Sequence, residues 1–330
     1  MTEALKPLKT WSHLAGRRRR PSEYEIVSTN LLWHMRDQGQ PWDVAQTGPM
    51  ADWYRRYRNG SPVTHPDWDA FRDPDELVYR TYNILQDGQE SYVEGLLDQH
   101  DEEQHDKGLS AEWVASLARL YTPGRYLLHT LQMGSAYLVH MAPASTIANC
   151  AAFQTADALR WLSHTAYRTA ELARSHPSSG FGSAERERWE NLPAWQGFRR
   201  LMEKVLVTHD WAEAFVALDL VAKPAIDEAF FRQQSVSARR QGDTLFALMA
   251  EAALRDSERS RRWSSELVRF MHDVPDNAAV LQGWVEKWTP LAHEAIEGFC
   301  AELPDAPEAA TSAIAATGRF HSELQTLLDA

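Results

Sequence analysis

Helical periodicity runs through most of this chain and is the feature that most limits its possible folds. In the stretch ELVYRTYNILQDGQESYVEGLL, for example, apolar side chains recur at helical spacings, as Leu77, Tyr82, Leu85, Tyr92 and Leu96 show. No segment has the two-residue alternation of a half-buried strand, and no glycine-rich phosphate loop is present. We therefore predict an all-α protein of eight to ten helices, packed as a bundle.

The chain divides into three segments. Residues 1–74 contain seven prolines, so no long helix can run through them, yet they are also rich in tryptophan, which disordered segments lack. We interpret them as an ordered, irregular arm that docks on a partner subunit through Trp11, Trp33, Trp42 and Trp53. Residues 75–303 form the predicted helical domain, and the alanine-rich residues 304–330 form a peripheral tail.

Proline and capping residues predict where the helices of the central domain begin and end. Ser110 is a predicted N-cap, and Thr122–Gly124 is a predicted break. A long helix is expected after Pro143, closed by His176 and Pro177, and Pro224 is expected to separate two further helices.

Composition narrows the possible environments and partners. The formal net charge is −12, which argues against a general affinity for nucleic acid. The run Arg17–Arg20 is the local exception and leaves a nucleic-acid-binding helical protein as an alternative. No apolar run reaches the roughly 20 residues of a membrane helix, and the N-terminus lacks the apolar core of a signal peptide. With Cys150 and Cys300 as its two cysteines, both in apolar contexts, the chain is expected to be reduced and cytoplasmic.

One motif suggests iron. Glu102-x-x-His105 has the spacing that di-iron bundles use twice, together with a further glutamate from each of two other helices. The residues around it are polar on every face of the turn, as in a solvated helix end, and no second Glu-x-x-His exists in the chain. We favour a surface position for Glu102 and His105, with a self-sufficient di-iron oxidase as the alternative.

A second pair of motifs is more informative. Asp157-x-x-Arg160 and Asp256-x-x-Arg259 lie 99 positions apart, each within a long predicted helix. Such pairs are common on helix surfaces, where they contribute only tenths of a kcal/mol. The alternative is that the two helices face each other and that Asp157 pairs with Arg259 and Asp256 with Arg160 across the core, because a buried carboxylate needs a positive partner. The sequence shows no zinc-ligand spacing, nucleophile elbow or other catalytic constellation.

At these two motifs the chain resembles the β subunit of the hydroxylase component of bacterial multicomponent di-iron monooxygenases, in particular the toluene/o-xylene branch. The matching stretches, which extend from about residue 9 to 290, are KTWSHLAG, RRPSEYEIVSTNL, DPDELVYRTYNILQDGQESY, LQMGSAYLVHMAPASTIANC, QTADALRWLSHTAYRTAEL and DWAEAFVALDLVAKP.

This resemblance implies a ferritin-like helical bundle without iron. Asp157, Arg160, Asp256 and Arg259 would stand where the catalytic α subunit has its Glu-x-x-His motifs. That subunit's other glutamate ligands would fall near Leu127 and Ala222, which are apolar. The chain would then be a non-catalytic structural subunit with no cofactor of its own.

The resemblance also implies partners. The family assembles as a dimer of αβγ units with the di-iron centre in α. A regulatory protein, a Rieske-type iron–sulfur ferredoxin and an FAD-containing reductase complete a system that hydroxylates toluene-like or phenolic rings with O2 and NADH. No nucleic-acid or membrane partner is expected.

Overall fold

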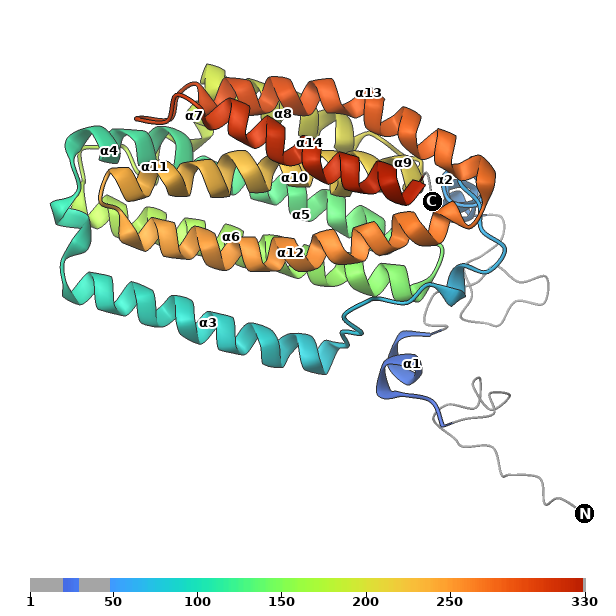
Figure 1. Ribbon diagram of the computed structural model, residues 1–330. Coiled ribbons are helices and arrows are strands. Elements are labelled where there is room, and N and C mark those ends of the chain that lie inside the picture. Colours follow the sequence, from blue (N-terminus) through green and yellow to red (C-terminus); the bar gives the residue numbers. More distant parts are fainter. Residues whose placement is uncertain (1–19, 30–47, 329–330) are drawn as a thin grey trace, which may run out of the picture.

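The computed structural model describes residues 20–29 and 48–328, and every regular element within these ranges is a helix (Figure 1). The predicted all-α fold is therefore confirmed. The α-helices are α1 (Glu23–Ser28), α2 (Pro49–Tyr57), α3 (Tyr79–Glu102), α4 (Ala111–Ser116), α5 (Gly124–Met141), α6 (Ser145–Ser175), α7 (Glu185–Asn191), α8 (Pro193–Leu206), α9 (Trp211–Phe215), α10 (Lys223–Ile226), α11 (Gln234–Arg240), α12 (Thr244–His272), α13 (Pro275–Cys300) and α14 (Ala309–Leu328). The short 3-10 and π segments are η2 (Trp68–Ala70), η3 (His105–Gly108), η4 (Leu117–Tyr121), η5 (Val216–Ala222) and η6 (Asp227–Gln233).

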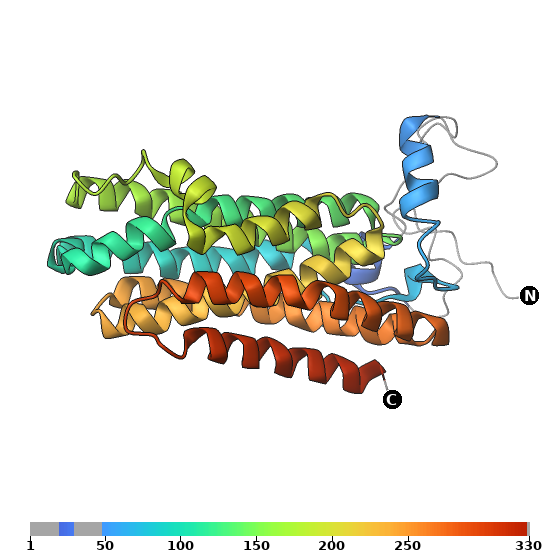
Figure 2. The ribbon, with the colours of Figure 1, turned by 90° about the horizontal axis from the view of Figure 1, so that it is seen from above.

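The long helices α3, α5, α6, α12, α13 and α14 run along one common direction and form an elongated bundle (Figure 1). Seen from above, α5 and α6 (green) lie on one side of α12, and α14 (dark red) lies on the other (Figure 2). The core between them is aromatic: the rings of Trp113, Trp195 and Trp211 are fully buried. Trp161, Trp189, Trp263 and Trp288 are buried as well, so seven of the thirteen tryptophans of the sequence pack inside the chain.

Helices α8 and α13 cross at a point where only glycine fits. A Cβ atom on Gly197 of α8 would lie 2.6 Å from the Cα of Ala295 in α13, closer than real Cβ atoms approach a backbone atom. Glycine therefore lets the two helix backbones pack against each other, which brings Phe198 of α8 against Phe299 of α13.

Pro224 does not separate two helices, contrary to the prediction. The chain is helical without interruption from Trp211 to Arg240, and Pro224 lies at the start of α10 inside that span. Proline removes one hydrogen bond and clashes with the preceding turn of a regular α-helix. Here the preceding turn is the wider π segment η5, which accommodates the ring. The helix begins at Trp211, and its N-cap is Asp210, whose carboxylate accepts hydrogen bonds from the backbone of Ala212 and Glu213, both at 3.0 Å.

The other predicted boundaries agree better with the structure. Ser110 is an N-cap, with its hydroxyl 3.1 Å from the backbone nitrogen of Trp113, and α6 ends at Ser175 as expected. The described residues contain more helices than the eight to ten predicted, because the arm adds two short ones and π segments subdivide the span 211–240. The last segment, expected to be peripheral, forms α14, which packs on α12 and α13 and buries Phe320 and Leu324.

The described parts of the N-terminal arm are tied to the end of the bundle. Within the arm, the backbone nitrogen of Asp73 donates to the Tyr24 hydroxyl at 2.9 Å. Between the arm and the bundle, Ser145, the first residue of α6, donates to the carbonyl of Ser28 at 2.5 Å. Helix α2 packs near the end of α5, with the Tyr54 hydroxyl 3.0 Å from a ring nitrogen of His140. The contacts of Ser28 and Tyr54 hold the described parts of the arm against the end of the bundle where α5 ends and α6 begins.

Candidate functional site

The two Asp-x-x-Arg motifs meet in a buried cluster between α6 and α12. Arg259 donates to a carboxylate oxygen of Asp157, and Arg160 Nη1 lies 3.2 Å from Asp256 Oδ2. Both aspartates are buried, and the side chain of Arg160 is 16% exposed. Within each motif the contacts are longer, 3.8 Å for Asp157–Arg160 and 3.4 Å for Asp256–Arg259. The cross-helix contacts are therefore the shorter ones, and Arg160 also forms an ion pair with Glu90 of α3.

Helix α3 covers this cluster and satisfies its remaining polar atoms. The amide of Gln86 donates to Asp157 at 2.8 Å and to Asp256 at 3.0 Å, while its oxygen accepts from Arg160 at 2.7 Å. The Tyr82 hydroxyl donates to Asp157 at 2.8 Å, and the indole nitrogen of Trp161 donates to Asp256 at 2.9 Å. A closed polar network of this kind fixes the relative positions of three helices.

The charges of the cluster influence one another. Burial raises the pKa of Asp157 to about 6, and the nearby Asp256 carboxylate adds to this, while Arg259 and the Tyr82 hydroxyl act in the opposite direction. Glu90 at the edge of the cluster behaves differently. Burial would raise the pKa of Glu90, but hydrogen bonds from His164 at 3.0 Å and from Arg160 at 2.8 Å outweigh it and lower that pKa.

The donor set of the cluster does not fit a di-iron centre. Iron in such bundles needs carboxylate and imidazole lone pairs that are free to coordinate, and Arg160 and Arg259 supply only N–H donors and positive charge. Leu127 on α5 and Ala222 on η5 are fully buried apolar residues. Within the described ranges, no group of three or more His, Cys, Asp or Glu side chains is arranged to hold a metal ion.

Glu102 and His105 do not share a helix. Helix α3 ends at Glu102, and Gln104 has a positive φ of 55°, so the chain turns before the 3-10 segment η3 that contains His105. Glu102 is exposed, as expected. The expectation of a fully solvated turn is wrong for His105, whose ring nitrogen lies 3.1 Å from the buried carboxylate of Asp243. Asp243 also caps α12 through the backbone nitrogen of Phe246, so His105 belongs to a helix-capping arrangement.

A family model described as methane/phenol/alkene hydroxylase matches residues 53–275. The chain belongs to this hydroxylase family. The β subunit of the hydroxylase component of the toluene-4-monooxygenase system of Ectopseudomonas mendocina is 53% identical over 91% of this chain and 92% of its own length. The oxygenase component of phenol 2-monooxygenase from Pseudomonas sp. strain CF600 is 25% identical over 79% of this chain and 76% of that protein. The resemblance to hydroxylase β subunits is thereby confirmed.

Solved structures of this hydroxylase family share the fold. A structure of toluene 4-monooxygenase with toluene in its resting active site matches with a TM-score of 0.86 and 53% identity, covering 91% of this chain and 99% of the matched one. The phenol hydroxylase of Pseudomonas sp. OX1 matches with a TM-score of 0.83 at 20% identity, covering 98% of each chain, which is a likeness of fold. The ferritin-like bundle expected from the sequence is consistent with both.

The sequence did not reveal the contribution of α3 to the cluster. Tyr82, Gln86 and Glu90 recur every four residues, so they line one face of the helix, but polar side chains at that spacing are also typical of a solvated face. A second buried group was also missed. Asp219 in η5 accepts a hydrogen bond from Gln154 of α6, and burial raises the pKa of Asp219 to about 7.

The arm contributes one predicted docking residue to the described structure. Trp53 packs at 4.8 Å from the ring of His209 and donates to the Tyr137 hydroxyl at 3.2 Å, both in this same chain. Trp11, Trp33 and Trp42 lie outside the described residues, so docking of the arm on a partner stays a prediction. Of the run Arg17–Arg20, Arg20 alone is described, and it is exposed.

Two further observations concern the cysteines and the possibility of a membrane-spanning helix. Cys150 and Cys300 are both free and buried. None of the helices in the described ranges is long and apolar enough to span a membrane.

Proposed function

We propose that this chain is the non-catalytic, structural β subunit of the hydroxylase component of a di-iron aromatic monooxygenase of the toluene/o-xylene/phenol type. The 53% identity to a toluene-4-monooxygenase hydroxylase β subunit supports this assignment. The catalytic α subunit would hold the di-iron centre, and this chain would supply the rigid frame on which α is positioned.

The observation that carries the proposal is the pairing of Arg160 with Asp256 and of Arg259 with Asp157. Two guanidinium groups neutralise the two carboxylates of the bundle core, so the positive charge that a metal would bring is already provided by the chain. A ferrous ion placed there would meet two fixed positive charges at close range. Asp157, Arg160, Asp256 and Arg259 therefore act as structural core ion pairs in place of iron ligands.

The wider system follows from the same assignment. This subunit would assemble with α and γ subunits as (αβγ)2 in the cytoplasm, and the complex would receive electrons from NADH through an FAD- and iron–sulfur-containing reductase and a ferredoxin. A small regulatory protein would bind the assembled hydroxylase. Residues of this chain would contribute packing and electrostatics to the frame, with no contact to the substrate or to O2.

Reconstitution with and without this chain tests the proposal. The α and γ subunits of the same hydroxylase are expressed either with or without the β chain, and toluene oxidation is measured with the complete electron-transfer system. We expect stable hydroxylase and NADH-dependent product formation only when this chain is present. Full activity and normal oligomeric mass in its absence would contradict a framework role.

A further inference from the structure

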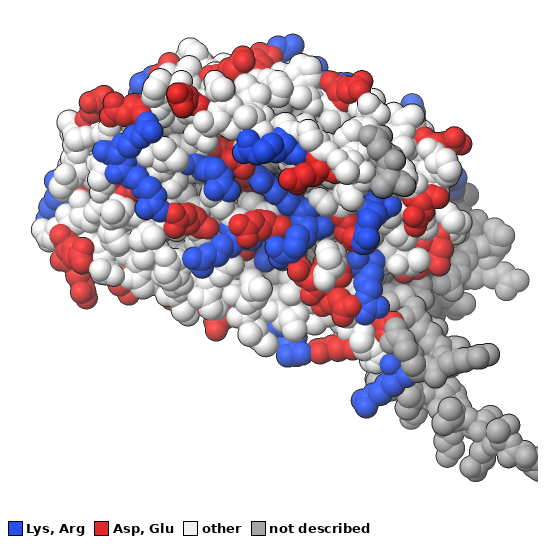
Figure 3. All heavy atoms as spheres, in the orientation of Figure 1, with Lys and Arg blue, Asp and Glu red and all other residues white. Residues whose placement is uncertain are grey.

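A groove runs between α12 and α14, on the side of α12 that faces away from α5 and α6 (Figure 2). Its volume of about 950 Å³ lies within the range of small-molecule sites, roughly 300–1,000 Å³. Lys and Arg side chains gather in a band across this face of the molecule, with Asp and Glu among them (Figure 3). The whole chain has a net charge of −12, yet five arginines line this groove: Arg232, Arg261, Arg262, Arg269 and Arg319.

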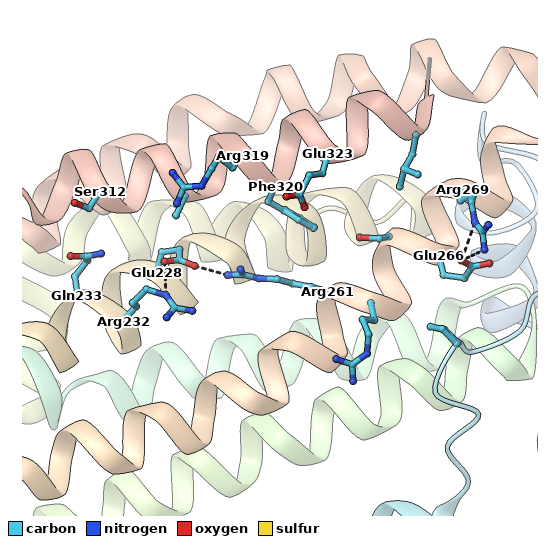
Figure 4. Close-up of a pocket in the computed structure, with 15 residues that line it drawn as sticks. Glu228, Arg232, Gln233, Arg261, Glu266, Arg269, Ser312, Arg319, Phe320 and Glu323 are labelled. Atoms are coloured by element: carbon cyan, nitrogen blue, oxygen red, sulfur yellow. Dashed lines mark hydrogen bonds and ion pairs between the residues drawn. The ribbon is translucent and has the colours of Figure 1, made fainter. Parts of the chain in front are cut away.

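The charges at one end of the groove are already paired. Arg269 and Glu266 form an ion pair at this end (Figure 4). Arg262 lies 2.9 Å from a carboxylate oxygen of Asp75, in the segment that precedes α3. Each arginine at this end therefore has its own carboxylate, and no positive charge is left over for a ligand.

Positive charge is in excess at the other end. Arg232 of η6 and Arg261 of α12 share one carboxylate, because each lies 2.9 Å from an oxygen of Glu228. Arg319 of α14 lies across the groove from them (Figure 4), and within the described residues it forms no ion pair or hydrogen bond. Glu323 of α14 is the second carboxylate that lines this part of the groove. Three arginines and two glutamates leave a net charge of +1.

A further carboxylate near Arg261 does not cancel this excess. Asp227 lies 3.7 Å from Arg261, but Lys223 donates to Asp227 at 3.0 Å, so these two charges balance each other. The guanidinium carbon of Arg261 lies 5.8 Å from the ring centroid of Phe320 on α14, within the range of a cation–π contact. Arg261 is therefore held in position by contacts with both walls of the groove.

Two neutral donors at the same end have no partner. Gln233 of η6 lines the groove and is only 8% exposed, and its amide forms no hydrogen bond within the described residues. The hydroxyl of Ser312, at the same end (Figure 4), likewise has no partner among these residues. A buried amide without a partner is unfavourable unless a bound molecule supplies one. The amide of Gln233 is thus an independent sign of a ligand where the positive charge is in excess.

We propose that this end of the groove binds the phosphate group of a small organic phosphate. Arg232, Arg261 and Arg319 come from three different elements, and a phosphate ester has three strong acceptor oxygens where a carboxylate has two. Guanidinium groups bind phosphate through paired, charge-assisted hydrogen bonds. Gln233 and Ser312 supply the neutral donors. The site is separate from the ion-pair cluster and independent of the proposed function.

The wall formed by α14 sets the character of the rest of the ligand. Ala316 and Phe320 line the groove from this helix, and Leu327 lies further along it. A carbon skeleton attached to the phosphate therefore meets apolar side chains as it leaves the charged end. Such a ligand contacts η6, α12 and α14 at once, so its binding should raise the melting temperature of the chain.

Calorimetric titration of the full-length chain with phenyl phosphate tests the proposal, with the ionic strength held constant by sodium chloride. We expect saturable binding at one site per chain, a higher melting temperature at saturation, and much weaker binding of phenol, which lacks the phosphate. Inorganic phosphate should bind about tenfold more weakly than phenyl phosphate, because it lacks the carbon portion that contacts α14. Equal affinity for inorganic phosphate and phenyl phosphate would contradict an organic ligand, and the absence of saturable binding would overturn the proposal entirely.

Three variants locate the site. Arg319→Gln removes an exposed arginine that has no partner, and Gln233→Met removes the amide at nearly constant side-chain length, so both variants should keep the helical content of the wild type. Arg255→Gln is the matched control, since Arg255 is an exposed arginine of α12 outside the groove lining. We expect the Kd for phenyl phosphate to rise about tenfold for Arg319→Gln and about fivefold for Gln233→Met, and to stay within about twofold for Arg255→Gln.

Three results would overturn the proposal and leave the proposed function untouched. Equal weakening by Arg319→Gln and Arg255→Gln would show a general attraction of charge. Wild-type affinity in both Arg319→Gln and Gln233→Met would place the ligand elsewhere. Sedimentation of the chain with vesicles that contain phosphatidic acid, abolished by Arg319→Gln, would assign the groove to a lipid headgroup instead of a small organic phosphate.

Discussion

Arg160 Nη1 lies 3.2 Å from Asp256 Oδ2, although the two residues are 96 positions apart in the sequence. The reciprocal pair, Asp157 with Arg259, joins the same two helices, so α6 and α12 are linked by two ion pairs of opposite polarity. Such an arrangement specifies register, because sliding one helix by a turn would leave buried charges of both signs without partners.

Removing one member of a cross-helix pair should destabilise the fold strongly. Arg259→Met leaves Asp157 buried without its main positive partner, and we expect the free energy of unfolding to fall by about 3–5 kcal/mol. The exposed pair of Arg186 and Glu190 supplies the control, and Arg186→Met should leave the free energy of unfolding almost unchanged, because water screens an exposed ion pair. Urea unfolding followed by circular dichroism measures both. Similar small effects for the two variants would show that the buried pair is not required for the fold.

The carboxyl of Asp219 should make stability depend on pH. Burial raises the pKa of Asp219 to about 7, and its second oxygen, Oδ2, has no hydrogen-bond partner among the described residues. A raised folded-state pKa means that the folded protein binds the proton more tightly than the unfolded chain. Proton binding by Asp219 therefore stabilises the folded state fully below the unfolded-state pKa of 3.8, and this stabilisation is lost as the pH rises through about 7.

Asp219→Asn removes this dependence. The variant's free energy of unfolding minus that of wild type should increase by up to about 4 kcal/mol as the pH rises from 4 to 8, since each unit of pKa shift corresponds to about 1.4 kcal/mol. Taking the difference between the two proteins cancels the contribution of Asp157, whose pKa is raised in both. If the unfolding free energies of the variant and wild type differ by the same amount at every pH in this range, the raised pKa of Asp219 is contradicted.

Two glycines should respond to alanine with opposite signs. Gly197→Ala places a Cβ against the backbone of Ala295, and we expect a loss of about 1–3 kcal/mol. Gly283 lies within α13 with no heavy atom within 4 Å of a built Cβ, so Gly283→Ala should add about 0.5–1 kcal/mol through helix propensity. Melting temperatures of the two variants should therefore move in opposite directions. A rise in both melting temperatures would mean that the close contact of α8 and α13 relaxes easily, and a fall in both would mean that Gly283→Ala gains nothing from helix propensity.

The two Asp-x-x-Arg motifs could be found from the sequence because a motif that is repeated within long helices is recognisable even where the helix ends are predicted wrongly. It could not find Gln86 or Tyr82, because a polar residue on an amphipathic helix has the same sequence pattern whether it meets water or a buried carboxylate. The predicted helix break at Pro224 was wrong for a different reason. A π segment accommodates the proline ring, and no residue pattern in the sequence predicts such a segment. His105 was misplaced because its partner, Asp243, lies 138 positions away.

The central claim, that this chain supplies structure rather than a metal centre, is tested most directly by its iron content. The purified full-length chain is incubated anaerobically with ferrous ion, freed of loosely bound metal by gel filtration and analysed for iron per chain. The ion-pair cluster predicts a value near zero, and the same treatment of the assembled hydroxylase should yield iron that follows the α subunit. About two tightly bound iron ions per isolated chain would contradict the account, and Asp157, Asp256 and Glu102 would then have to be reconsidered as ligands.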